Sequence, residues 1–171
     1  MAIMKLKLIQ YPNPLLSEKS KKISLIDDSI KKLAADMAET MKGYGTEEEA
    51  GVAIAAIQVG VPIRLTVVRD EEVPEGYFVL INPEVVKGSK NELLDMEGCM
   101  SVPQKYGKVA RYEKVKVKAL NIKGQKIEIK AEGLMARILQ HEIDHMNGQL
   151  FLSHVEPGEI YKLTDEGKLV K

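Results

Sequence analysis

Residues 134–150, LMARILQHEIDHMNGQL, hold two of the three histidines of the chain, His141 and His145. Leu134, Ile138, His141 and His145 are spaced by four, three and four residues, so they share one face of an α-helix. Residues between and beside them are largely apolar, which indicates that this face is buried. The spacing therefore predicts a helix that carries both histidines on its buried face.

The same helix predicts a metal site. Histidines at positions i and i+4 can bind one ion through both imidazoles, and Glu142 between them completes an HExxH pattern. Two core histidines can match such a short pattern by chance. A glutamate on the buried side of a helix, however, needs a partner or a chemical task. We therefore expect a metal at His141 and His145, with Glu142 close enough to reach a water molecule beside it.

The HExxH pattern supplies two metal ligands but does not identify the third. In the longer zinc-protease pattern a third histidine follows six residues later, and Phe151 stands there, which excludes that class. Glu159 or Glu166 could supply a carboxylate from the polar C-terminal tail. Cys99 is the only cysteine and lies in DMEGCMSVP, which predicts a bent strand or a turn. A lone cysteine is more often a small buried side chain, but beside a histidine pair a thiolate is the better third ligand.

Composition narrows the class of protein. The 171 residues carry 25 basic and 25 acidic side chains and no basic patch, so nothing indicates a nucleic-acid partner. No apolar run approaches the roughly 18 residues of a membrane span, and residues 1–14 lack a signal sequence and are expected to form the first strand. A single cysteine cannot form an internal disulfide, so we expect a reducing, cytoplasmic location.

Periodicity predicts an α+β fold. A helix is expected over residues 27–45, capped by Asp27 or Asp28. Strands are expected at 64–68 and 77–82, and an antiparallel hairpin at 113–132 with its lysines facing solvent. Hairpins in place of βαβ units favour the α+β class. We expect one catalytic domain over residues 1–171, whose tail from about 155 is extended or mobile.

A third segment of interest is GVAIAAIQVGVP, residues 51–62. Its small residues let the backbone approach another group closely, and it is expected as a core strand or the start of a helix. Beside a metal site, Gln58 becomes a candidate donor to a developing oxyanion. The acidic stretch before it, GTEEEAG at 45–51, is expected to be a solvated loop.

Three motifs in this order resemble the peptide deformylase family. GVAIAAIQ (51–58), EGCMS (97–101) and QHEIDH (140–145) match its GxGxAAxQ, EGCxS and QHExDH segments. The likeness covers roughly residues 8–152 and includes Arg111. Any one motif is weak, whereas the combination is specific. The resemblance implies antiparallel sheets and hairpins packed around the helix that carries HExxH.

The resemblance also implies an activity, which is removal of the formyl group from N-terminal formyl-methionine of nascent polypeptides, with release of formate. The working metal would be Fe²⁺, with Zn²⁺ or Ni²⁺ as substitutes in preparations. Glu142 would be the base that takes a proton from the attacking water and passes it to the departing amine. We expect a cytoplasmic monomer that meets its substrate at the ribosome. The implied metal ligands are Cys99, His141 and His145.

The remaining family roles fall on residues around the metal. Gln58 and the backbone N–H of Met100 would hold the oxyanion. Substrate would add as a strand, with Leu134 and Ile138 lining the methionine pocket. The implied backbone contacts to substrate are Val52, Ala53 and Gly98, and Gly51 is a further implied substrate-binding residue.

Two departures from the family pattern leave alternatives to weigh. Ala53 replaces the second glycine of the first motif, and Met100 replaces the usual leucine. If the Ala53 methyl blocked the catalytic pose, the chain would be a non-catalytic binder of formylated N-termini or one of altered specificity. A zinc peptidase using Glu159 or Glu166, and a purely structural metal site, are two further alternatives. Arg111 is expected to pair with Glu97 and brace the Cys99 turn.

Overall fold

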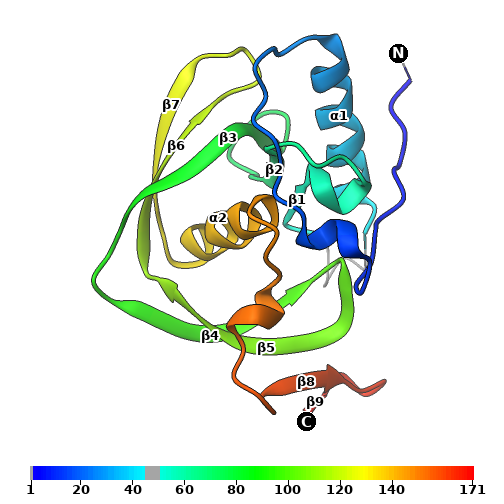
Figure 1. The fold of residues 1–171 in the computed structure, drawn as a ribbon, viewed down its shortest axis with the longest axis vertical. Coiled ribbons are helices and arrows are strands. Elements are labelled where there is room, and N and C mark those ends of the chain that lie inside the picture. The colour runs from blue at the N-terminus through cyan, green and yellow to red at the C-terminus, as the bar shows by residue number, and fades with distance from the viewer. Residues whose placement is uncertain (1, 45–50) are drawn as a thin grey trace.

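Helix α2 (Gly133–Met146), which carries HExxH, lies between two antiparallel sheets (Figure 1). The computed structural model describes residues 2–44 and 51–171. The five-stranded sheet has the order β1-β2-β3-β6-β7 and the four-stranded sheet the order β4-β5-β8-β9. This arrangement confirms the predicted α+β class, with sheets and hairpins around a central helix.

Further elements complete the chain. The first sheet contains β1 (Ala53–Ala55), β2 (Leu65–Arg69), β3 (Tyr77–Gly88), β6 (Lys114–Leu120) and β7 (Lys126–Glu132). The second contains β4 (Glu92–Cys99), β5 (Val102–Tyr112), β8 (Ile160–Leu163) and β9 (Leu169–Val170). Helix α1 spans Asp28–Lys42, and three short 3₁₀ helices are η1 (Pro14–Ser17), η2 (Ala56–Val59) and η3 (Phe151–His154).

Helix α1 forms as its sequence predicts. The Asp27 carboxylate accepts hydrogen bonds from the N–H groups of Ser29 and Ile30, which caps the helix. Met37 and Met41 are fully buried in the core against the first sheet. Both methionines therefore belong to the hydrophobic core.

The hairpin of β6 and β7 is also confirmed. Val115 pairs with Ala131 and Val117 with Ile129, and the valines are buried against α2 and β3. Lys114 and its alternating neighbours point away from this core. Strict alternation, with a turn at residues 121–124, was sufficient to set the register.

The stripe of α2 is buried only toward its C-terminal end. His145 is fully buried, His141 and Ile138 are half-buried, and Leu134 is 69% exposed. The prediction of a wholly buried stripe was therefore wrong for Leu134. The physical reason is that the first turns of the stripe line a cavity, whereas the neighbouring face, with Leu139 and Met146, packs into the core.

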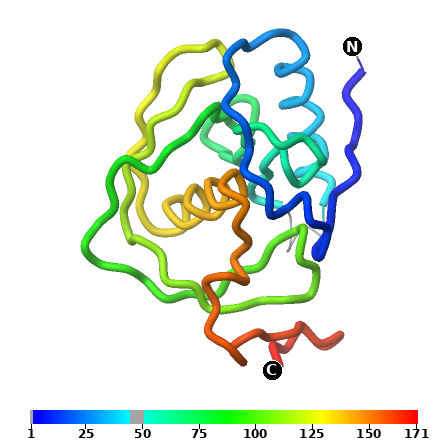
Figure 2. The backbone as a smooth tube through the Cα atoms, in the orientation of Figure 1, coloured from blue at the N-terminus to red at the C-terminus, as the bar shows by residue number. Residues whose placement is uncertain are grey.

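Residues 92–112 form a hairpin that the sequence did not predict. Strands β4 and β5 pair from Glu92–Tyr112 to Cys99–Val102, with a register irregularity between Glu97 and Cys99. The hairpin passes beneath α2 (Figures 1 and 2). Its glycines and charged residues interrupt the alternation of apolar and polar side chains that is typical of a strand. Cys99 ends β4 at this irregularity, which agrees with the predicted bend.

The N-terminal segment was wrongly expected to be a strand. It runs extended beside α1 but pairs with neither sheet (Figure 2). The Met4 N–H donates to the Asp36 carboxylate (2.9 Å), and the Leu6 N–H donates to the Thr40 hydroxyl (2.8 Å). Polar side chains of the helix thus bond the backbone N–H groups that a neighbouring strand would otherwise have paired. The loop expected at 45–51 lies outside the described residues apart from Gly51.

The C-terminal tail folds back on the second sheet. Strand β8 pairs with β5 through Lys105–Lys162, Tyr106–Tyr161 and Gly107–Ile160. Strand β9 pairs with β8 and ends the chain at the edge of this sheet. Among the described residues, no helix has the length and apolar character needed to cross a bilayer.

Gly148 is expected to be essential for the end of α2. Its φ is +75°, and a Cβ there would overlap the backbone carbonyl of Ser17. Gly148→Ala should lower the free energy of unfolding by about 2–4 kcal/mol, from left-handed strain plus overpacking. Gly124→Ala is the matched control, because its φ is +78° but its nearest neighbour, Ile26, is 3.7 Å away. Equal losses in urea denaturation would contradict the expected clash.

Candidate metal centre and active site

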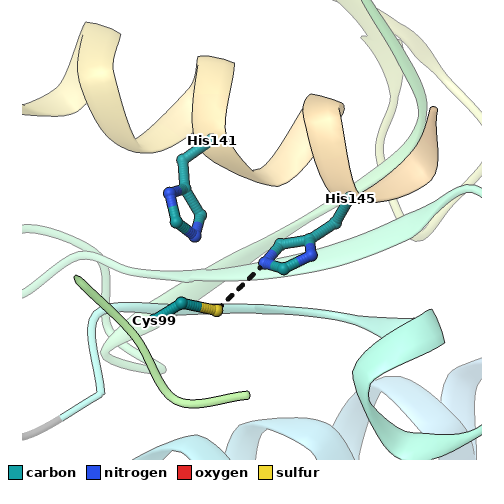
Figure 3. A group of neighbouring side chains, drawn as sticks. All are labelled: Cys99, His141 and His145. Carbon is teal, nitrogen blue, oxygen red and sulfur yellow. Dashed lines mark hydrogen bonds between the residues drawn. The ribbon is translucent and has the colours of Figure 1, made fainter. Parts of the chain in front are cut away.

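Cys99, His141 and His145 come together although 42 residues separate Cys99 from the first histidine (Figure 3). Their ligand atoms lie within 4.8 Å of one another. Cys99 Sγ is 3.3 Å from His145 Nε2. Strand β4 supplies the sulfur and one face of α2 supplies both imidazoles.

This donor set fits one divalent ion. Donors around a tetrahedral ion, at bond lengths of roughly 2.0–2.3 Å, lie roughly 3.3–3.6 Å apart. The observed 3.3 Å between sulfur and nitrogen agrees with that spacing. Thiolate and imidazole together suit Zn²⁺, Fe²⁺ or Ni²⁺ better than a hard ion such as Mg²⁺. Three protein ligands leave a fourth position for water or substrate, as in catalytic sites.

Glu97 orients the first histidine. Its Oε2 lies 3.0 Å from His141 Nδ1, which directs the other ring nitrogen toward Cys99. Arg111 donates to both oxygens of the same carboxylate at 2.9 and 3.0 Å, so the predicted Glu97–Arg111 pair is confirmed. Burial would raise the pKa of Glu97, but hydrogen bonds from His141 and Arg111 outweigh it and hold that pKa well below its usual range. Glu97 is therefore a buried carboxylate.

Two further charged residues complete this network, and the sequence analysis missed both. Arg137 donates to Glu97 (2.8 Å) and to the carbonyl oxygens of Leu93 (2.7 Å) and Val109 (2.9 Å). It thereby ties α2 to the hairpin that carries Cys99. Asp144 binds Arg111 from the other side. The available signal was the position of Arg137, four residues before His141 on the same helical face.

Glu142 is buried beside the three candidate metal ligands. Its side chain lines the central cavity, and Oε2 lies 3.4 Å from the Thr66 hydroxyl. Burial raises the pKa of Glu142 to about 7, against the opposing influence of His141. A carboxyl group with such a pKa can both take and return a proton near neutral pH. Thr66 gave no signal in the sequence, because a threonine in a buried strand is ordinary.

Gln58 is held in place from both ends of its amide. The Oε1 atom accepts a hydrogen bond from the Ala55 N–H (2.8 Å). Its Nε2 donates to the Ser101 hydroxyl (3.1 Å) and lies 3.5 Å from Cys99 Sγ. The amide N–H groups are thus directed at the ligand sulfur, beside Met100, which also lines the cavity.

One cavity of about 600 Å³ connects these residues. All the predicted site residues line it except His145, which is fully buried. The predicted substrate-binding residues in its wall are Gly51, Val52, Ala53, Gly98, Leu134 and Ile138. Among the described strands, β1 and β4 lie at the edges of their sheets, so each presents one side to which a further strand could pair.

The two departures from the family pattern leave the centre of the site intact. Ala53 pairs with Val68 in β1 without a positive φ, and its side chain is buried in the core formed with β2 and α2. Its methyl therefore packs within that core. The side chain of Met100 lies against Gly51 and the core of α1 and also lines the cavity.

The alternative third ligands are engaged elsewhere. Glu159 accepts a hydrogen bond from the Tyr161 hydroxyl (2.7 Å), and Glu166 pairs with Lys168 (3.3 Å) in the β8–β9 turn. His154 is exposed, and its Nε2 lies 2.9 Å from the Asp144 carboxylate. Within the described residues, the structure gives no support to a carboxylate-ligated peptidase.

Known proteins are similar to this chain in both sequence and fold. A family model described as polypeptide deformylase matches residues 5–160. A peptide deformylase of Carboxydothermus hydrogenoformans is 47% identical over 150 residues, which are 88% of this chain and 93% of that protein. A crystal structure of a peptide deformylase from Legionella pneumophila superposes with a TM-score of 0.81 at 42% identity, covering 91% of this chain and 88% of that one.

A second solved structure contains a ligand. The peptide deformylase from Synechococcus elongatus, in complex with actinonin, has a TM-score of 0.81 at 36% identity and covers 92% of this chain and 82% of that one. Sequence and fold therefore match over nearly the whole length, including the segments that hold Cys99, His141 and His145. On this evidence the chain belongs to the peptide deformylase family.

Proposed function

We propose that this chain is a metal-dependent hydrolase that removes the formyl group from the N-terminus of formyl-methionyl nascent polypeptides. Formamide and water are converted to formate and a free amine. Family membership and the Cys–His–His cluster beside Glu142 support this proposal. Three ligands and an adjacent carboxyl group are what such a hydrolysis needs, whereas a structural site is normally closed by four protein ligands.

The ion supplies Lewis-acid chemistry when bound, by polarising the formyl carbonyl and lowering the pKa of water. Glu142 takes a proton from the attacking water and returns it to the departing amine. The Gln58 amide and the backbone N–H of Met100 stabilise the negative charge that develops on the formyl oxygen. Glu97 holds His141 in the tautomer that leaves its second nitrogen free for the ion.

Substrate is proposed to lie between the two sheets. Its backbone pairs with the free edges of β1 and β4, at Gly51, Val52, Ala53 and Gly98. Leu134 and Ile138 contact the methionine side chain. The large exposed area of Leu134 supports this role, because an apolar side chain at a cavity mouth gains free energy when a ligand covers it.

Several finer assignments belong to the same proposal. Fe²⁺ is the proposed working ion, with Zn²⁺ or Ni²⁺ as substitutes, because all three accept this ligand set. A reducing, cytoplasmic location suits a lone thiolate ligand. We further propose a single catalytic domain that acts as a monomer on chains at the ribosome.

Formate release tests the function directly. Protein purified without oxygen and loaded with Fe²⁺ is incubated with formyl-Met-Ala, and formate is measured with a coupled dehydrogenase. Release that a chelator abolishes and added metal restores would support the proposal. Binding of the peptide with no formate from fully loaded protein would favour the non-catalytic binder.

Ala53→Gly distinguishes these two candidates further. Because the Ala53 methyl is buried in the core, we expect kcat/KM for formyl-Met-Ala to stay within about threefold of the parent. The free energy of unfolding should fall by about 1 kcal/mol, from lost packing and a more flexible backbone. A gain of tenfold or more in activity would show instead that the methyl obstructs the substrate.

A further inference from the structure

The two groups proposed to hold the oxyanion lie in short turns that follow strands of different sheets. Gln58 is in η2, which follows β1 of the first sheet, and Met100 is in the turn between β4 and β5 of the second sheet. Neither sheet therefore fixes the position of one donor relative to the other. Donors to an oxyanion need to be held within about 0.5 Å of the productive geometry, so other contacts have to align the two turns.

The N-terminal segment makes hydrogen bonds to both turns. The Ile9 N–H donates to the backbone carbonyl of Gln58 at 2.7 Å, and the Tyr11 N–H donates to the backbone carbonyl of Ser101 at 2.8 Å. Alternate residues of an extended chain face the same way, so residues 9–11 can bond both turns at once. These three residues therefore form a backbone bridge between the turn of Gln58 and the turn of Met100.

Burial makes both hydrogen bonds of this bridge costly to lose. Gln58 and Ser101 are almost completely buried. Water is therefore a poor substitute for the N–H groups of Ile9 and Tyr11, and a buried carbonyl without a donor costs free energy. The same Ser101 also accepts the hydrogen bond of the Gln58 side-chain amide at 3.1 Å. Displacement of the Ser101 backbone would therefore disturb both proposed oxyanion donors.

The N-terminal segment is anchored on each side of residues 9–11. Before them, the Leu6 N–H donates to the Thr40 hydroxyl of α1 at 2.8 Å. After them, the Ser20 N–H donates to the carbonyl of Met146, the last residue of α2, at 2.9 Å. The segment thus runs down beside α1 and then turns toward the C-terminal end of α2 (Figure 2). Anchors on both helices hold the bridge in place between them.

We propose that residues 9–11 form a positioning strap, which aligns the Gln58 amide with the Met100 N–H around the oxyanion. The strap acts through its backbone N–H groups, and its residues do not line the active-site cavity. The inference rests on the proposed function, because it concerns the same oxyanion. It predicts that loss of the strap lowers kcat and leaves KM unchanged, since the oxyanion develops only in the transition state.

Replacement of Ile9 or of Tyr11 by its α-hydroxy acid tests the strap, because the resulting ester keeps the side chain and removes one backbone N–H. In metal-loaded protein each ester should lower kcat for formyl-Met-Ala by about tenfold and leave KM within about twofold. The loss is smaller than the roughly 10²–10³ expected for a whole oxyanion donor, because the Gln58–Ser101 hydrogen bond remains.

Hydrogen exchange provides a second measurement that does not depend on activity. The exchange rate of the Met100 N–H is followed by NMR in the zinc-loaded protein. The Tyr11 ester should raise this rate by about fivefold, which corresponds to the loss of one hydrogen bond that holds the turn. An unchanged rate would overturn the inference.

The α-hydroxy acid at Leu6 is the matched control. It removes one N–H of the same segment, but that N–H donates to Thr40 on α1 and not to either turn. This ester should lower the urea midpoint about as much as the other two, because each loses one hydrogen bond, and should keep the parent kcat. An ester at Ile9 or Tyr11 that kept the kcat of the Leu6 ester would overturn the inference.

Failure of the proposed function would give a different result. No formate from formyl-Met-Ala with the loaded parent would contradict that function, whereas exchange of the Met100 N–H would still report whether the strap holds its turn. Equally fast exchange in the Leu6 and Tyr11 esters would show a general loosening of the fold and would overturn the positioning role.

Discussion

Replacing Glu142 by glutamine should lower kcat by roughly 10²–10⁴ while metal binding and fold are retained, because positioned proton transfer contributes about that much. Glutamine preserves the volume of a side chain that is only 4% exposed and keeps a hydrogen-bonding group beside the Thr66 hydroxyl. It cannot take a proton from water. Formate release from formyl-Met-Ala, normalised to metal content, measures the effect.

The matched control for Glu142→Gln is Glu128→Gln. Glu128 lies on β7, is partly exposed and pairs with Lys116 at 3.1 Å, far from any ligand of the ion. This variant should keep the activity of the parent. A fully metallated Glu142→Gln that retained more than a tenth of the parent kcat would show that another group transfers the proton.

Glu97→Gln should weaken both the metal site and the fold. Glu97 is buried and bonded to Arg111, Arg137 and His141, so loss of its charge leaves two arginines without their shared carboxylate. Breaking such a buried cluster costs about 3–5 kcal/mol of folding free energy. Weaker orientation of His141 should raise the metal Kd by about 10–100-fold. Chelator competition and urea denaturation measure the two effects separately.

Glu84→Gln provides the comparison for Glu97→Gln. Glu84 pairs with Lys22 at 2.7 Å, and both side chains are more than half exposed, so its loss should cost well under 1 kcal/mol. Metal affinity should stay at the parent value. If Glu97→Gln lost stability but kept its metal affinity, the carboxylate would brace the hairpin without orienting the ligand.

Local patterns in the sequence determined the elements that bear the chemistry. The 3.6-residue period placed His141, Glu142 and His145 on one helix, and the period of two set the β6–β7 hairpin, because these patterns concern residues close together in the chain. The helical period led to a wrong prediction for Leu134. It shows that residues share a face of a helix, but not whether that face packs into the core or lines a cavity. The mixture of lysine and apolar residues at the N-terminus likewise could not distinguish a strand from an extended segment bonded to α1.

Contacts between distant residues were decided only by the tertiary structure. The β4–β5 hairpin passes beneath α2 and brings Cys99 to the histidines, and Arg137 fixes that meeting through three hydrogen bonds. Motif order predicted the cluster by family resemblance, but no local pattern encodes a register irregularity at Cys99 or a tail that returns beside Tyr106. Such contacts join segments that are tens of residues apart in the sequence. They stabilise the fold only after the chain has closed the loops between those segments. The sequence by itself therefore placed the candidate residues His141, Glu142 and His145 on one helix, whereas the tertiary structure decided which distant side chains support them, because those contacts form only when the chain folds.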